Sequence, residues 1–137
     1  SILSKELLNQ AYFVDLKMLK STVFLNENNK FVSQKLPSEL QYSPIYAITA
    51  NDINKDGYTD LFFGGNQYLV KPRFGRYDAS MGWVLFGSKE ESISTSKPVT
   101  LNIKGQIRGL NWVKHNNIKL LIATINNEKT SFYSIKE

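Results

Sequence analysis

The chain has 137 residues, 42% of them hydrophobic and 21% charged, which is typical of one globular domain or of part of a larger one. It contains no cysteine, and this excludes disulfide bonds, thiolate metal sites and a cysteine nucleophile. We expect neither a membrane span nor a signal peptide, and because the chain opens at Ser1 we expect a processed protein or an excised piece.

The net charge of +5 lies at the C-terminal end, where residues 97–137 hold seven basic and two acidic side chains against ten of each in residues 1–96. These basic residues are single and widely spaced, and no aromatic side chains alternate with them. The spacing favours a solvated surface over a nucleic-acid contact. We therefore expect no nucleic-acid partner.

The first predicted element is a helix over residues 4–19. This segment lacks Gly and Pro, places Leu7, Ala11, Val14 and Met18 at helical spacing, and offers Ser4 as an N-cap. Residues 1–20 are thus expected to form a short N-terminal helix and a linker.

From residue 21 onward the pattern changes to short β-rich runs separated by Asn, Gly and Pro. Many of the thirteen Asn residues fall in the breaks, where turns favour them. The fold class is therefore predicted to be all-β. The expected strands are TVFLN, FVSQKL, IYAITA, DLFFGG, WVLFG, ISTSK (93–97), IRGLNWV, KLLIATI and SFYSIK.

An internal repeat is also predicted. Residues 21–37 align without gaps with residues 82–98, and residues 45–66 align at the same offset with residues 106–127. Each copy places two strands around a short loop and ends in a GGN or INN turn. Such a period indicates repeated supersecondary units.

The loop DINKDGYTD at 52–60 carries the strongest chemical signal, with oxygen-bearing side chains at relative positions 1, 3, 5 and 9: Asp52, Asn54, Asp56 and Asp60. Gly57 can adopt the positive φ that a tight loop needs, and the Tyr58 carbonyl can add a ligand. Oxygen ligands without His or Cys indicate Ca²⁺.

The alternative is a hairpin turn with solvated carboxylates. Three carboxylates within nine residues, offset only by Lys55, favour the metal, because converging carboxylates need a counter-ion. An EF-hand is excluded, since position 12 is Phe63 and the flanks are predicted strands. The second repeat lacks this ligand set and should bind nothing; its equivalent residues are Val113, His115, Asn117 and Leu121.

The stretch NDINKDGYTDLFFGGN resembles an FG-GAP repeat, the unit of integrin alpha-subunit propellers and of many bacterial surface proteins. The wider run over residues 21–137 is similar to the C-terminal end of FG-GAP-type proteins from Bacteroidetes-like bacteria. The resemblance implies that Asp52, Asn54, Asp56, Asp60 and the Tyr58 carbonyl bind calcium. The chain departs from the family in its metal-free second repeat and in the insertion QYLVKPRFGRYDAS.

The resemblance further implies two to three blades of an incomplete β-propeller. Residues 21–44 would end a preceding blade, 45–98 would form a complete blade with the calcium loop, and 99–137 would form a final, metal-free partial blade. A propeller closes with at least four blades. The partners expected are therefore the remaining blades of a parent chain or, as the alternative, other copies that cover the open faces.

The insertion gathers Arg76, Tyr77 and Asp78, which are candidate binding residues because loops on a β scaffold often carry function. Alternatively, Arg76 and Asp78 form an ion pair that fixes the loop. Trp83 and Trp112 lie in strand patterns, where core packing is favoured over sugar stacking.

The only histidine, His115, is expected to be a polar surface residue, because no Ser or Asp motif marks a catalytic partner. The expected function is thus a non-catalytic, calcium-binding propeller segment of a bacterial protein located outside the cell, on its surface or in the periplasm, and mediating protein or glycan interaction. The alternatives are the scaffold of a propeller lyase or hydrolase and a stand-alone glycan-binding β module.

Overall fold

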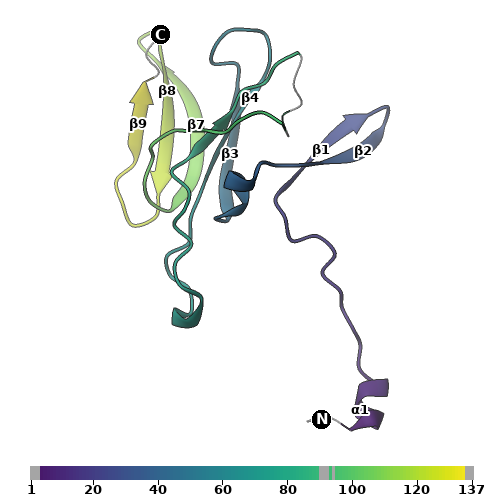
Figure 1. The fold of residues 1–137 in the computed structure, drawn as a ribbon. Coiled ribbons are helices and arrows are strands. Elements are labelled where there is room, and N and C mark those ends of the chain that lie inside the picture. The colour runs from purple at the N-terminus through teal and green to yellow at the C-terminus, as the bar shows by residue number, and fades with distance from the viewer. Residues whose placement is uncertain (1–3, 90–92, 94, 135–137) are drawn as a thin grey trace.

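The computed structural model describes residues 4–89, 93 and 95–134, which form three antiparallel sheets, one α-helix and two 3-10 turns (Figure 1). The helix is α1 (Lys5–Asn9), and the 3-10 turns are η1 (Ser38–Gln41) and η2 (Pro72–Phe74). The strands are β1 (Thr22–Glu27), β2 (Lys30–Lys35), β3 (Ile45–Asn51), β4 (Asp60–Gly65), β5 (Trp83–Leu85), β6 (Val99–Thr100), β7 (Ile107–His115), β8 (Ile118–Ile125) and β9 (Ser131–Ser134).

Each sheet follows the order of the chain. β1 pairs with β2, β3–β4–β5–β6 form a four-stranded sheet, and β7–β8–β9 form a three-stranded one. Neighbouring strands run antiparallel throughout. The predicted all-β class is therefore confirmed.

The predicted helix over 4–19 is wrong beyond its first turns. α1 ends at Asn9, and residues 11–19 contain no helix or strand. The apolar side chains that the predicted helix would have buried, Leu7, Val14 and Met18, are all exposed and are not packed in a core. A helix of this length is marginal in water without tertiary packing. In α1, the Ser4 side chain does cap the helix as expected, accepting from the Leu7 amide.

Eight of the nine predicted strands coincide with observed ones, with the last residues of SFYSIK outside the described part of the chain. The remaining predicted strand, ISTSK at 93–97, is wrong, because its described residues form no strand. The fourth strand of the sheet that begins with β3 is instead β6. Ser and Thr side chains compete for backbone hydrogen bonds, and Pro98 cannot donate to a ladder. The four-stranded sheet thus extends past residue 98, where we predicted that this unit would end.

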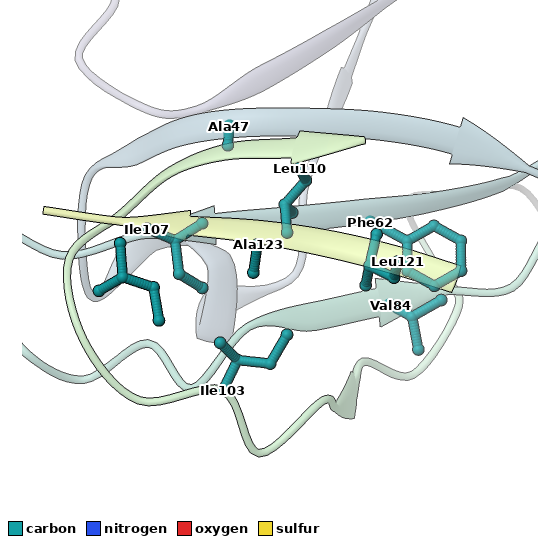
Figure 2. Close-up of a cluster of buried hydrophobic side chains, with 9 residues drawn as sticks. Ala47, Phe62, Val84, Ile103, Ile107, Leu110, Leu121 and Ala123 are labelled. Carbon is teal, nitrogen blue, oxygen red and sulfur yellow. The ribbon is translucent and has the colours of Figure 1, made fainter. Parts of the chain in front are cut away.

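The main core lies between the four-stranded and three-stranded sheets (Figure 2). Residues of the β3–β6 sheet and of the segment after it pack against residues of the β7–β9 sheet. The first group is Ala47, Phe62, Val84 and Ile103, and the second is Ile107, Leu110, Leu121, Ala123 and Ile125. The sheets approach so closely that a Cβ atom on Gly64 would lie 2.5 Å from the Ile107 side chain. Phe62 and Trp112 meet edge to face across this interface, with ring centroids 5.0 Å apart.

A second cluster joins the β1–β2 hairpin to the opposite face of β4. Leu36, Leu40, Phe63 and Leu85 are buried there. Trp83 packs against this cluster and Trp112 against the main core, so the predicted packing role of both tryptophans is confirmed.

The predicted repeat has a counterpart in the hairpins β3–β4 and β7–β8. Both contain a register shift at the same place, between Ile45 and Ala47 in one and between Ile107 and Gly109 in the other. β3 and β7 also lie against each other in the packed pair of sheets (Figure 1). The two hairpins therefore occupy corresponding positions in their sheets.

Candidate metal centre

The acidic loop connects β3 to β4 at one end of the four-stranded sheet. The strand ladder ends at the pair Asn51 and Asp60, so the residues between them leave the sheet. Lys55 has φ 60° and Gly57 has φ 90°, and these two left-handed residues fold the loop back on itself. The predicted positive φ of Gly57 is confirmed.

The loop gathers the side chains of Asp52, Asn54 and Asp56. The Asp56 amide lies 3.2 Å from Asp52 Oδ1 and 3.3 Å from Asn54 Oδ1, so both oxygens approach one nitrogen. Asp52 Oδ2 accepts from the Gly57 amide at 2.9 Å, and the Asn54 side-chain amide donates to Asp56 Oδ2 at 2.8 Å. Asp56 Oδ1 accepts from the Tyr58 amide at 2.8 Å. The loop is thus organised by its own polar side chains.

Asp60 has a different environment, because it is the first residue of β4 and is fully buried. Its Oδ2 accepts from the Ile53 amide at 2.9 Å, and its Oδ1 accepts from the Gly87 amide at 3.0 Å. The carboxylate therefore links the beginning of the loop and the segment after β5 to the start of β4. Both donors are neutral, so a nearby cation would reduce the cost of burying this charge.

The donor chemistry of the loop fits a hard divalent cation, since every candidate ligand is an oxygen. Within the described ranges, however, no three His, Cys, Asp or Glu side chains are gathered closely enough to hold a metal ion. The structure brings Asp52, Asn54 and Asp56 together and holds Asp60 on backbone amides. Each carboxylate oxygen of Asp60 retains a second lone pair for a further partner.

Sequence reasoning missed Gly87. A Cβ atom at this position would lie 2.4 Å from the Thr59 carbonyl oxygen, so only glycine lets its amide reach Asp60. The available signal was a glycine directly after the apolar strand WVLF, which is typical of close backbone approach.

The sequence alignment predicted that Val113, His115, Asn117 and Leu121 of the second hairpin, β7–β8, would correspond to the metal-loop residues. The observed register shows that this alignment is off by one residue, because the pair Val113 and Leu120 occupies the place of the pair Asn51 and Asp60. The ladder continues to the pair His115 and Ile118, and only Asn116 and Asn117 form the turn. His115 is exposed and lies 3.3 Å from the Asn116 side-chain amide.

At the opposite end of the four-stranded sheet, residues 67–78 form a hairpin between β4 and β5, which we call the β4–β5 hairpin. Gln67 and Tyr77 close it with two backbone hydrogen bonds of 2.8 and 2.9 Å. Arg76 Nε lies 3.8 Å from Asp78 Oδ2, which confirms the predicted ion pair. The Arg76 guanidinium also lies 3.9 Å from the centre of the Tyr68 ring.

Arg108 supports the base of this hairpin and was not identified from the sequence. Its guanidinium donates to the Asn66 carbonyl and to Gln67 Oε1, each at 2.9 Å, and stacks on Tyr46 at 4.1 Å. A single arginine within a strand gives no signal of this role, because its partners lie about forty residues away.

Comparison with family models, with curated proteins and with solved structures gave no significant match. The resemblance to FG-GAP repeats therefore stays a prediction. Among the described residues, no helix has the length and apolar character that crossing a membrane requires.

Proposed function

We propose that this chain is a non-catalytic, calcium-stabilised segment of a β-propeller in a protein exported from a bacterial cell. The observation that carries the proposal is the loop after β3, where oxygens of Asp52 and Asn54 both approach the Asp56 amide and the Asn54 side-chain amide donates to Asp56 Oδ2. The Tyr58 carbonyl and Asp60 complete the proposed ligand set, Asp60 through a second lone pair on its carboxylate.

The sheets support the propeller part of the proposal. β3–β6 is a four-stranded antiparallel sheet in chain order, as a propeller blade would be, and β7–β9 is a similar sheet of three strands packed on its face. The shared register shift of their first hairpins is expected if the two sheets are repeats. β1 and β2 would be the last strands of a preceding blade.

Exposed apolar side chains favour further blades as the partner. In the N-terminal third they include Tyr12, Phe13, Leu16, Leu19, Phe24 and Phe31. Apolar surface of this extent usually marks an interaction site. We propose that the remaining blades of a parent chain cover this apolar surface. The alternative is that other copies of the chain cover it.

Bound calcium would stabilise the fold, because the loop that would hold it joins β3 to β4. Loops of this kind have dissociation constants of about 10⁻⁴ to 10⁻³ M, a range that suits calcium outside the cytosol and hence an extracellular, surface or periplasmic location. The ligand of the assembled protein, a protein or a glycan, would contact loops such as the one containing Arg76, Tyr77 and Asp78.

Thermal unfolding with calcium and with a chelator tests the proposal. We expect calcium at ten times its dissociation constant to stabilise the chain by about 1.4 kcal/mol and so to raise its melting temperature. Asp56→Ala should remove this difference, because it deletes a ligand at the exposed tip. Asp78→Ala, an exposed carboxylate in another loop, is the matched control and should retain it.

Tyr58 allows a direct readout, because a nearby tyrosine can sensitise terbium luminescence. Terbium should bind the parent chain and be displaced by calcium, but not by magnesium at the same concentration. The proposal is wrong if the parent melts identically in calcium and in chelator and gives no terbium signal.

A further inference from the structure

The β4–β5 hairpin carries apolar and basic side chains that have no part in the calcium proposal. The β4–β5 hairpin starts where β4 ends, whereas the acidic loop precedes β4, so the two lie at opposite ends of the sheet. Figure 1 shows the segment between β4 and β5, with its short helical turn, projecting away from the three sheets. Leu69 and residues 71–79 are exposed.

The tip of this hairpin combines apolar and cationic side chains. Leu69 is 77% exposed and Phe74 is 56% exposed, and the described structure packs neither into a core cluster. Between and beside them lie Lys71, Arg73 and Arg76, against one carboxylate, Asp78. The tip thus carries an excess of two positive charges next to uncovered apolar surface.

The tip is also held in shape by its own contacts. η2 is closed by hydrogen bonds from the Phe74 amide to the Lys71 carbonyl at 2.9 Å and from the Gly75 amide to the Pro72 carbonyl at 3.3 Å. Arg73 lies over the Phe74 ring at 4.7 Å. At the base, the Tyr68 amide donates to Gln106 Oε1 at 2.9 Å, which attaches the hairpin to the start of β7. Little conformational freedom would be lost when such a tip binds.

We propose that the β4–β5 hairpin contacts a lipid bilayer with anionic headgroups, inserting Leu69 and Phe74 into the interface while Lys71, Arg73 and Arg76 contact the headgroups. A projecting tip can present both kinds of side chain to a flat surface at once, and the positive excess complements the lipid charge. This inference is independent of calcium, and it gives the β4–β5 hairpin a lipid surface as its ligand in place of the protein or glycan named in the proposed function.

The exposed N-terminal segment, residues 12–19, is the competing apolar surface. It contains one acidic and one basic residue, Asp15 and Lys17, so its net charge is zero. Because the chain as a whole carries a net charge of +5, adsorption through this segment could also favour anionic lipid. It would not change when Lys71 and Arg73 are replaced, so variants at the tip distinguish the two surfaces.

Vesicle co-sedimentation of the whole chain tests the proposal, with phosphatidylcholine vesicles and with equal mixtures of phosphatidylcholine and phosphatidylglycerol, both in a chelator. Each basic residue near an anionic surface contributes about fivefold to partitioning, so two net charges predict about 25-fold tighter binding to the mixed vesicles. This preference should fall as salt is added. The chelator separates a failure here from a failure of the calcium proposal.

Two paired variants locate the contact. Leu69→Ser with Phe74→Ser should weaken binding to mixed vesicles about tenfold or more, and Lys71→Gln with Arg73→Gln about 25-fold. The matched control is Lys30→Gln with Phe31→Ser in the β1–β2 hairpin, where Phe31 is 76% exposed; it should bind like the parent. Circular dichroism should show that every variant keeps the parent's β signal.

Three results would overturn the proposal. The first is equal binding to neutral and anionic vesicles, and the second is loss of binding in Leu16→Ser with Leu19→Ser while the tip variants bind normally. The third is binding to soluble polyglutamate without binding to vesicles, which would assign the tip to an acidic protein partner.

Discussion

Asp56 lies in the acidic loop and Asp60 is the first residue of β4, and the structure gives these two aspartates different surroundings. Asp56 is exposed and hydrogen-bonded within the loop, whereas Asp60 is fully buried and accepts from two amides on separate segments. Replacing Asp56 changes the exposed tip of the loop, whereas replacing Asp60 leaves the half-buried Ile53 and Gly87 amides without their acceptor. Such donors cost about 1–3 kcal/mol each.

Asp60→Ala should therefore lower the free energy of unfolding by about 2–5 kcal/mol even without calcium, because the Ile53 and Gly87 amides lose their acceptor. Asp56→Ala, measured in the same chelator, should cost less than about 1 kcal/mol. Urea titrations followed by circular dichroism give both values. Equal losses in the two variants would contradict the structural role of Asp60.

At the scale of elements, asparagine shapes the connections. Of the eight non-glycine residues with positive φ in the described ranges, seven are Asn. Four of these Asn residues form two-residue hairpin turns, Asn28–Asn29 between β1 and β2 and Asn116–Asn117 between β7 and β8. Asn tolerates this conformation, and turns with two such residues match the twist of antiparallel strands. The prediction of Asn-rich turns is confirmed here.

The turn in β7–β8 allows alanine and glycine to be compared at a position with positive φ. Asn117 has φ 62°, so Asn117→Ala should destabilise the chain by about 1 kcal/mol, while Asn117→Gly should be neutral or stabilising. Asn111→Ala, on the strand of the same hairpin, controls for the loss of an exposed amide group. Thermal unfolding measures all three. If the Ala and Gly variants melt at the same temperature, backbone strain at this turn is not the cause.

Across the whole molecule, stability depends on the packing of one sheet on another. Phe62 from β4 and Trp112 from β7 meet in the main core, and Gly64 allows the strands to approach there. An isolated two-stranded hairpin is marginally stable, and a larger sheet is stabilised by burying its hydrophobic face. We expect the four-stranded and three-stranded sheets to unfold together.

Phe62→Ala should thus destabilise the chain by about 3–5 kcal/mol and lower the hydrogen-exchange protection of amides in β4 and in β8 to a similar extent. Phe31→Ala, at an exposed position, should stay within about 0.5 kcal/mol of the parent. Native-state hydrogen exchange makes the measurement. Loss of protection confined to β3–β6 would show that the two sheets are independent units.

The β content, most strand positions, the turns and the acidic loop could be predicted from the amino-acid sequence. Each follows from residues close together in the chain: alternating β-branched runs, Asn pairs at hairpin ends, and three carboxylates within nine residues. The spacing also identified Gly57 and the pairing of Arg76 with Asp78, since both depend on neighbours only a few residues away.

The end of α1, the position of β6, the burial of Asp60 and the support of the β4–β5 hairpin by Arg108 could not be predicted and became visible only in the folded chain. These features depend on contacts between distant residues, such as Asp60 with Gly87, 27 positions apart, and Arg108 with Asn66, 42 apart. Residues 10–19 do not form the predicted helix for the same reason. A short amphipathic segment is a stable helix only where another surface buries its apolar side chains.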